Sequence, residues 1–428
     1  MHYHYFIGID RSDQTIDYCL LSNQQDTLAQ EKINASPESL IIWITSLLEK
    51  IPKNSKIALC IEQPCQNLVN FFSQFEALHI FLENPTVIKK YRESLSASRA
   101  KDDKRDAAAI AQYIFERHNK LEPFSNNDPI CDQIATLVEK RRQLVGIRTS
   151  LSNKLTQALK DYFPQALELI GRDIHSPLSC AFLTKWSSLQ KLQKARISTI
   201  TQFYYQRNSR SSNRMEKRFK VIENAVPICT ENHLLEVYEL LTISLVKSIQ
   251  TIQSSIQQFE TLIEQKSSQH EDINIFRSLP GAGPCYSARL LAFMGSDRTR
   301  YTNASDIQQN SGVAPVTKQS GKMHFVHRRY ACNKFHRQTF VEWAAHTVMR
   351  SLWAKAYYIQ QKDQGHRHQS ILRSLAYKWQ RIIFRCWQDN KYYDEKVYLQ
   401  ALKRSSSSLI KTIENLKTTH PKLCEQFM

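Results

Sequence analysis

Six apolar residues in the second half of the chain recur at alternating spacings of four and three: Leu245, Ile249, Ile252, Ile256, Phe259 and Ile263. These spacings are the a/d pattern of a helix that buries one continuous seam against a partner helix. In an earlier segment with a helical pattern, leucine repeats every seven residues, at Leu137, Leu144 and Leu151. We therefore expect a long helical hairpin within the chain or a coiled coil between chains. Core faces of ordinary helices are the simpler alternative.

The first 120 residues differ, because short strands alternate there with helices. Strands are predicted at Tyr5–Asp10, at Ile16–Leu21 as its hairpin partner, at Lys56–Glu62 and at His79–Leu82; helices are predicted at Pro37–Lys50 and Asp103–Arg117. This alternation predicts a layered α/β domain, followed by a mostly helical remainder. We expect four parts: an α/β domain at 1–125, a helical region with a coiled coil and a basic linker at 126–270, a mainly helical domain at 271–400, and a helical tail at 401–428.

The charge of the chain indicates what kind of partner it binds. Its 428 residues include 58 Lys and Arg but only 40 Asp and Glu, a formal net charge of +18. This excess favours a polyanion such as nucleic acid over an acidic membrane surface, and no apolar run approaches the ~18 residues that a membrane span needs. The N-terminus lacks a signal-peptide pattern, and the ten cysteines form no CxxC pair. These features predict a cytoplasmic protein with free thiols.

Four carboxylates lie where a metal site can form. Asp10 and Glu62 each end a predicted strand, and Asp103 and Asp106 share one face at the start of a predicted helix. Ligands bind at strand ends in open sheets, and oxygen ligands suit Mg²⁺. Two such ions can stabilise the attacking and the leaving oxygen of a phosphoryl transfer. For any single residue, a strand-end charge or a favourable interaction with the helix dipole is an equally good explanation.

A second candidate is a basic segment, residues 313–338, with six Lys and Arg, three His and no acid. It contains Ser320 and Gly321, and Gly321 allows a phosphate to approach the backbone closely. A serine is a poor nucleophile unless a base, a metal or a cationic pocket activates it. The residues alone therefore predict only a loop. Its neighbouring cations could stabilise charge on a phosphate: Lys318, Lys322, Arg328 and Arg329.

Two further groups of basic residues are candidate nucleic-acid contacts. The segment from 207 to 220 has six basic residues and one acid, and a solvated linker is the default interpretation. The functional interpretation of this segment is a phosphate-binding surface. The candidates are Arg214, Lys217 and Arg218 there, and Lys101, Lys104 and Arg105 beside the helical acids.

Five stretches occur in the order and approximate spacing of a known family: FIGIDRS, IEQPCQNL, ENPTVIKKYRESLSASRAKDDKRDAAAIA, LPGAGPCYSARLLAFMG and NSGVAPVTKQSGK. The chain resembles the DEDD transposases of the insertion-sequence "one-ten" family. The relatives of that family include pilin-gene invertases and bridge-RNA-guided recombinases. The resemblance implies an RNase H-like (RuvC-like) domain at 1–125, a central coiled coil, and a transposase domain with a serine nucleophile at 271–400.

The resemblance also implies roles for single residues. The family's carboxylates map to Asp10, Glu62, Asp103 and Asp106, which would bind Mg²⁺, as two ions. Asp102 stands where the family usually has threonine. The serine nucleophile maps to Ser320, which would attack a DNA phosphate and form a transient phosphoserine link. The implied partners are donor and target DNA and a structured guide RNA. The Leu245 to Ile263 seam itself predicts a dimer or tetramer that forms through the coiled coil.

Two other functions remain open at this point. A RuvC-like nuclease would use a metal-activated water in place of the serine. A non-catalytic nucleic-acid-binding protein would need neither the carboxylates nor the serine.

Overall fold

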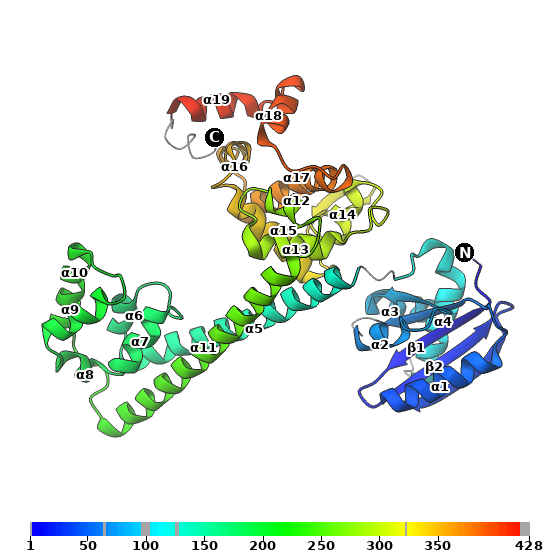
Figure 1. Cartoon of the computed structure of the whole chain (residues 1–428), viewed down its shortest axis with the longest axis horizontal. Helices are drawn as coiled ribbons and strands as arrows, with labels where there is room; N and C mark the ends of the chain where they lie inside the picture. Colours follow the sequence, from blue (N-terminus) through cyan, green and yellow to red (C-terminus); the bar gives the residue numbers. More distant parts are fainter. Residues whose placement is uncertain (1, 63–65, 96–102, 125–127, 322, 420–428) are drawn as a thin grey trace. The chain divides into compact units, whose positions relative to one another are not determined.

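The computed structural model describes residues 2–62, 66–95, 103–124, 128–321 and 323–419. The chain divides into two compact units, residues 1–126 and residues 127–428 (Figure 1). None of the helices within the described ranges is both long enough and apolar enough to span a membrane.

The first unit is built on a mixed five-stranded sheet with the strand order β3-β2-β1-β4-β5. Strands β1 (Tyr5–Arg11), β2 (Thr15–Ser22) and β3 (Thr27–Asn34) are antiparallel neighbours, whereas β4 (Ile57–Glu62) and β5 (Leu78–Glu83) run parallel to β1. The expected α/β, RNase H-like class is confirmed. Strand β3 was not predicted, because it is an edge strand whose mostly exposed residues lack an apolar alternation.

Helices cover both faces of this sheet (Figure 1). Helix α1 (Pro37–Lys50) has the predicted bounds, because Ser36 accepts the Ser39 N–H as a cap and Pro37 fits the first turn. Helix α4 (Asp103–Arg117) also has its predicted bounds and lies on the opposite face. The remaining helices of the unit are α2 (Gln66–Phe72), α3 (Pro85–Leu95) and the 3₁₀ helix η1 (His118–Lys120).

Helix α4 packs on β1 at a point where no side chain fits. A Cβ atom on Gly8 would lie 2.3 Å from the Ala107 carbonyl oxygen and 2.2 Å from the Ala111 nitrogen. Glycine therefore allows the helix backbone to touch the strand. This close approach fixes the position of Asp106, which adjoins Ala107, over the middle of the sheet.

The second unit contains two long antiparallel helices, α5 (Pro129–Tyr162) and α11 (Asn232–Ser267) (Figure 1). Hydrogen bonds join the two helices, and their positions advance along α5 as they go back along α11. Arg141 donates to Glu260 at 3.0 Å, Arg148 to Gln253 at 2.6 Å, and the Tyr162 hydroxyl to Thr242 at 2.9 Å. Leu245, Ile249, Ile256 and Ile263 of the predicted seam are buried. The expected helical hairpin therefore forms within the chain.

Five shorter helices lie between α5 and α11 in sequence: α6 (Gln165–Ile170), α7 (Pro177–Lys185), α8 (Leu189–Gln193), α9 (Ile197–Tyr205) and α10 (Ser212–Glu223). The prediction of a linker at 207–220 is wrong for most of that segment. Met215 of α10 is buried in the core of this group, and the Arg218 guanidinium lies 3.7 Å from the centre of the Tyr204 ring.

The C-terminal part of the second unit is helical except for one hairpin. Its elements are α12 (Ile273–Arg277), α13 (Gly283–Met294), α14 (Ala304–Asn310), β6 (Val316–Ser320), β7 (Met323–His327), α15 (Lys334–Thr347), α16 (Leu352–Asp363), α17 (His368–Gln388), α18 (Glu395–Arg404) and α19 (Leu409–Thr419). Buried tryptophans fill the core, and their indole N–H groups are satisfied: Trp379 donates to Thr347 and Trp387 to the Gly295 carbonyl, both at 2.9 Å.

Candidate active site

One charged side chain from each of the five strands lies in a single line across the sheet of the first unit. Lys32 of β3 pairs with Asp17 of β2, and Asp17 pairs with Asp10 of β1. Ile9 of β1 pairs with Ile61 of β4, so the next residues on these two strands, Asp10 and Glu62, lie side by side. Glu62 in turn pairs with Glu83 of β5. We call these five residues the charged row: Lys32, Asp17, Asp10, Glu62 and Glu83.

Side chains along a strand point alternately to the two faces of the sheet, and this alternation places the whole charged row on the face that α4 covers. Ile7 and Ile9 belong to the core beneath α1, whereas Phe6 belongs to the core beneath α4, so Asp10 is on the α4 side. The same rule applies to Glu62, which follows Cys60 of the α4 core by two residues. The predicted meeting of Asp10 with Glu62 at one sheet edge is what the strand register produces.

Asp106 contributes a buried carboxylate from α4 to this face of the sheet. Its Oδ2 atom accepts a hydrogen bond and ion pair from Arg92 of α3. Its Oδ1 atom is buried and has no hydrogen-bond partner among the described residues. An unpaired carboxylate oxygen in a buried position is costly, and a bound cation removes that cost. The oxygen-only donor set suits a hard divalent ion, so the residues present fit the metal that such a carboxylate site needs.

The other predicted ligand on α4 is Asp103. Asp103 is the first residue of α4, which places it one turn before Asp106 on the same side of the helix. Lys101 and Asp102 lie outside the described residues. Lys104 and Arg105 are exposed in the first turn of α4, and the Lys104 carbonyl accepts a 2.6 Å bond from the Gln30 side chain of β3.

Glu83, the last member of the charged row, is not among the site residues predicted from the sequence. The Tyr113 hydroxyl of α4 donates to its Oε2 atom at 2.6 Å, and the Asn84 N–H donates to Oε1 at 2.8 Å. Burial and the bond to Glu83 raise the pKa of Tyr113, which keeps its hydroxyl protonated as the donor. The pairing of β4 with β5 shows that Glu83 adjoins Glu62, and its position directly after the predicted strand at 79–82 is the sequence signal that could have indicated it.

Ser320 is the last residue of β6, in the hairpin of the second unit. It pairs with Met323 of β7, and Gly321 takes a left-handed conformation (φ +55°) in the turn between them. Lys318 is on the same face of the strand as Ser320 because two residues separate them. The hairpin is largely exposed, and Met323 and Phe325 each have 59% of their surface accessible.

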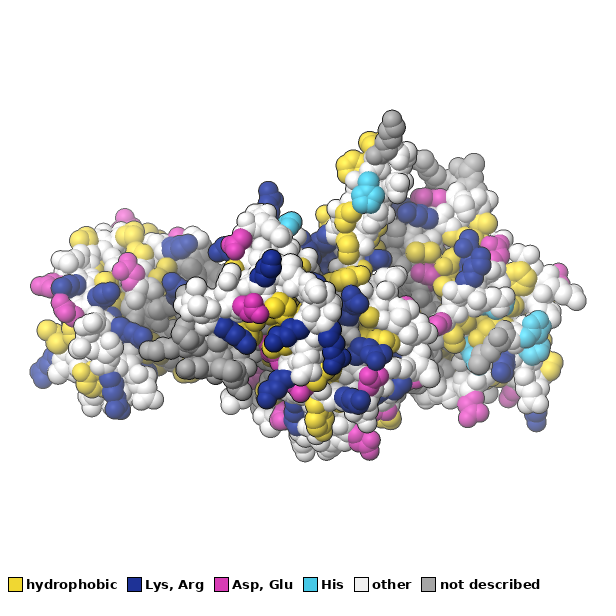
Figure 2. Space-filling model, turned by 90° about the horizontal axis from the view of Figure 1, so that it is seen from above, with side chains coloured by type: hydrophobic (Ala, Val, Ile, Leu, Met, Phe, Trp, Pro, Cys, Tyr) yellow, Lys and Arg dark blue, Asp and Glu magenta, His cyan; other side chains and the backbone are white. Residues whose placement is uncertain are grey.

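The predicted basic contacts differ in their surroundings. Arg214, Lys217, Lys318 and Arg328 are exposed, Arg218 is half-buried against Tyr204, and Lys322 lies outside the described residues. Arg329 donates to the Ala314 carbonyl at 3.3 Å and so also supports the base of the hairpin. On the face seen in Figure 2, Lys and Arg side chains also gather over the C-terminal helices, with acidic and hydrophobic side chains between them.

Asp128, Cys131 and His270 in the second unit also have ligand-type atoms close together, within 4.8 Å of one another. The His270 Nδ1 atom accepts the Asp272 N–H at 3.1 Å, so Nε2 carries the proton and donates to Asp128 at 3.1 Å. A histidine ligand instead uses one nitrogen for the metal and donates from the other. Burial, followed by the bond to Asp128, also raises the pKa of Cys131, which opposes the thiolate form. We therefore interpret this group as a hydrogen-bonded helix cap.

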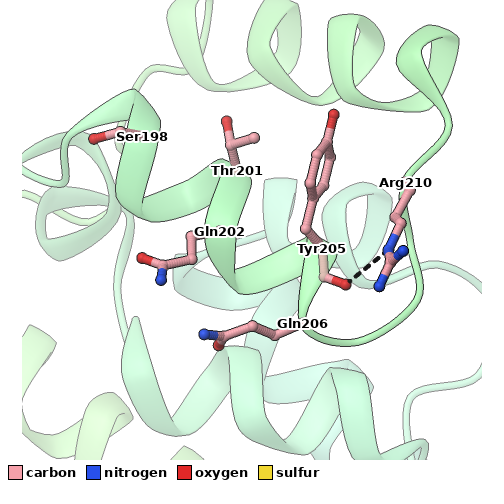
Figure 3. A pocket seen from close by; sticks show the side chains of 6 residues that line it. All are labelled: Ser198, Thr201, Gln202, Tyr205, Gln206 and Arg210. Carbon is pink, nitrogen blue, oxygen red and sulfur yellow. Dashed lines mark hydrogen bonds between the residues drawn. The ribbon is translucent and has the colours of Figure 1, made fainter.

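A shallow hollow of about 650 Å³ lies along α9 in the second unit (Figure 3). It is lined by Ser198, Thr201, Gln202, Tyr205, Gln206 and Arg210. Arg210 donates to the Tyr205 carbonyl at 3.3 Å. These side chains include no carboxylate, histidine or cysteine, so the hollow lacks the groups for acid–base or metal chemistry.

Comparisons with known proteins agree with this arrangement. A family model described as "Transposase", the DEDD transposase domain of the IS110 type, matches residues 7–164, and the model "Transposase IS116/IS110/IS902 family" matches residues 273–359. The "Mini-circle putative transposase for IS117" of Streptomyces coelicolor is 24% identical over 400 residues, which cover 91% of this chain and 95% of that protein. An IS900 protein of Mycobacterium paratuberculosis is 23% identical over 68% of this chain and 73% of its own length.

Between them the two models cover more than half of the chain: residues 7–164, from the first strand to the end of α5, and residues 273–359, which include the Ser320 hairpin. A DEDD domain implies a divalent metal, and a transposase binds DNA. The chain belongs to the IS110 family of transposases, enzymes of DNA transposition.

Proposed function

We propose that this chain cuts and rejoins the DNA of an insertion sequence, with Ser320 as the nucleophile and with Asp10, Glu62, Asp103 and Asp106 as ligands of two Mg²⁺ ions. The observation that carries the metal assignment is the register of Asp10 beside Glu62 beneath α4, together with the buried Oδ1 atom of Asp106, which has no hydrogen-bond partner among the described residues. Bound Mg²⁺ would supply stabilisation of the negative charge that develops on phosphate oxygens.

The serine step exchanges one phosphoester bond for another. As the Ser320 Oγ–P bond forms, one P–O bond of the DNA backbone breaks, the serine proton is released to water, and the departing sugar oxygen takes up a proton. Attack by a sugar hydroxyl of a second DNA end reverses these changes and restores the serine. Because the number of phosphoester bonds is constant, the exchange needs no nucleotide cofactor. The exposed hairpin and Lys318 on the same face of the strand as Ser320 support this role.

We further propose that the basic surface holds DNA and a structured guide RNA, and that the chain acts as a dimer or tetramer. The net charge of +18 and the exposed Lys104, Arg105, Lys318 and Arg328 support nucleic-acid binding. Because the predicted seam packs within the chain, another surface must join the copies. The first turns of α11 carry exposed apolar side chains that suit this role: Leu234, Val237, Leu240 and Leu241.

The test is a strand-exchange assay on DNA from the element's ends, with Mg²⁺ and the RNA that co-purifies with the protein. We expect Ser320→Ala to abolish the detergent-resistant protein–DNA adduct and to lower strand exchange roughly 1000-fold or more. Thr317→Ala, which removes an exposed hydroxyl from the same strand, is the matched control and should leave both intact.

Two outcomes would contradict the proposal. If Ser320→Ala still cleaves DNA while Glu62→Gln does not, the chain acts as a nuclease in which water attacks. If Glu62→Gln also remains active, the carboxylates do not hold the metal.

A further inference from the structure

Asp17, the β2 member of the charged row, is a buried acid next to a proposed metal ligand. Only 4% of its surface is accessible, and in the antiparallel register it lies directly opposite Asp10. Side chains opposite each other in such a pair share a face, with Cβ atoms roughly 4.5–5.5 Å apart. Cys19 and Leu21, at the same alternation, belong to the core under α4, which places Asp17 on that side too.

The two carboxylate oxygens of Asp17 are not equally satisfied. Lys32 of β3 lies 3.1 Å from Oδ2, and the Lys32 side chain is about half exposed. The Oδ1 atom is buried and has no hydrogen-bond partner within the part of the chain that the structure describes. Asp106 has the same pattern, with one oxygen paired to an arginine and the other unpaired.

A structural ion pair alone does not account for this arrangement. Two acids directly opposite each other in a sheet repel, and a buried oxygen without a partner adds a desolvation cost. Lys32 pairs with Asp17 and Arg92 with Asp106, and the Asp10 and Glu62 carboxylates lie on the same face as these two acids. A divalent cation between these groups would remove the repulsion and provide a partner for both unpaired oxygens.

We propose that Asp17 is a fifth carboxylate of the metal site, which binds a divalent ion directly or through a metal-bound water, while Lys32 holds its second oxygen. This inference rests on the proposed function, since it needs a metal at the Asp10, Glu62, Asp103 and Asp106 site. Asp17 lies outside that set of four, and it follows Asp10 in sequence by only seven residues.

The experiment is a titration of the full-length protein with Mn²⁺, without nucleic acid, by calorimetry or by the spin signal of free Mn²⁺. We expect Asp17→Asn to weaken Mn²⁺ binding roughly 10-fold, within the range seen when groups that support a metal site are removed. Asp13→Asn changes an exposed acid in the neighbouring turn and is the matched control, with unchanged affinity. Asp106→Asn should lose affinity at least as strongly as Asp17→Asn.

Lys32→Met keeps the test decisive if Asp17→Asn fails to fold. Loss of the competing cation should raise Mn²⁺ affinity about threefold and increase the thermal stabilisation by Mn²⁺, whereas a purely structural ion pair predicts a less stable protein with unchanged affinity.

Other outcomes separate this inference from the proposed function. If Asp106→Asn weakens Mn²⁺ binding while Asp17→Asn and Lys32→Met leave it unchanged, Asp17 is structural and the proposed metal site stands. If Asp106→Asn also binds Mn²⁺ normally, both proposals fail.

Discussion

Asp106 and Asp128 are both acids at the start of a well-packed helix, yet their surroundings are opposite. Asp128 caps α5 in the second unit and accepts bonds from four donors: the Ile130 N–H at 2.9 Å, the Cys131 N–H at 3.1 Å, the Ser296 hydroxyl at 2.9 Å and His270 at 3.1 Å. Asp106, in the first turn of α4, has an arginine on one oxygen and no hydrogen-bond partner on the other among the described residues.

On the proposed function, this difference separates a carboxylate that stabilises the fold from one that binds a metal ion. A helix start attracts acids in either case, because its free N–H groups and dipole favour negative charge. Asp128 is surrounded by donors, so its negative charge is compensated within the protein. Asp106 faces the acids of the charged row, and its Oδ1 atom has no hydrogen-bond partner among the described residues. The state of the second oxygen therefore distinguishes the two roles.

The largest effect is expected from a change that moves α4 itself. Gly8→Ala places a methyl group within 2.3 Å of backbone atoms of Ala107 and Ala111, so α4 must shift off β1. We expect a loss of about 3 kcal/mol or more in the free energy of unfolding of the first unit, and a loss of Mn²⁺ binding. Urea unfolding followed by circular dichroism measures the first effect.

The matched control is Gly146→Ala, in α5. A Cβ atom there would meet nothing within 4 Å, so the substitution should stabilise the helix by about 0.5–1 kcal/mol. If Gly8→Ala is as stable as the wild type and binds Mn²⁺ normally, the close contact between α4 and β1 does not position Asp106.

The comparison predicts opposite results for the two acids. Asp128→Ala leaves the Ser296, His270 and backbone donors without their acceptor, so we expect a loss of about 2–3 kcal/mol in stability and no change in Mn²⁺ affinity. Asp106→Asn removes a buried charge from an acidic row, so metal-free stability should change little while Mn²⁺ affinity falls. The interpretation fails if the substitution at 128 weakens Mn²⁺ binding or if the substitution at 106 destabilises the metal-free protein more.

Local signals predicted much of the first unit. The bounds of α1 followed from the Ser36-Pro37 start, and the strands carrying Asp10 and Glu62 followed from their apolar runs. The sequence could not show the charged row, because Asp17 and Glu83 join it only through pairing between strands. The roles of Asp10, Glu62, Asp103, Asp106 and Ser320 stay predictions, as does the division of the chain into four parts.

In the second unit, local signals were misleading where tertiary contacts decide the structure. The Ser- and Arg-rich segment before residue 220 has the composition of a linker, but α10 forms because Met215 is buried and Arg218 stacks on Tyr204. Likewise, Ser320 has loop-like neighbours, yet it ends a strand because β6 and β7 pair across the turn at Gly321. The apolar seam of α11 correctly predicted that this helix packs against another helix, but it did not indicate whether that helix belonged to the same chain.

A smaller effect follows from the titration of Asp128. Burial alone would raise its pKa, but bonds from Cys131, Ser296 and His270 outweigh burial and lower the pKa to about 2. A carboxyl whose pKa is lower in the folded than in the unfolded state stabilises the fold above its ordinary pKa of 3.8, and this contribution disappears as the pH falls toward 2. The full contribution is at most about 2 kcal/mol, and about half of it should remain at pH 3.

Urea unfolding of the wild type and of Asp128→Asn between pH 6 and pH 3 measures this contribution, because the variant lacks it at every pH. The stability gap between the two proteins should therefore narrow as the pH falls, and a constant gap would show that the four donors do not bind the charged form of Asp128 preferentially.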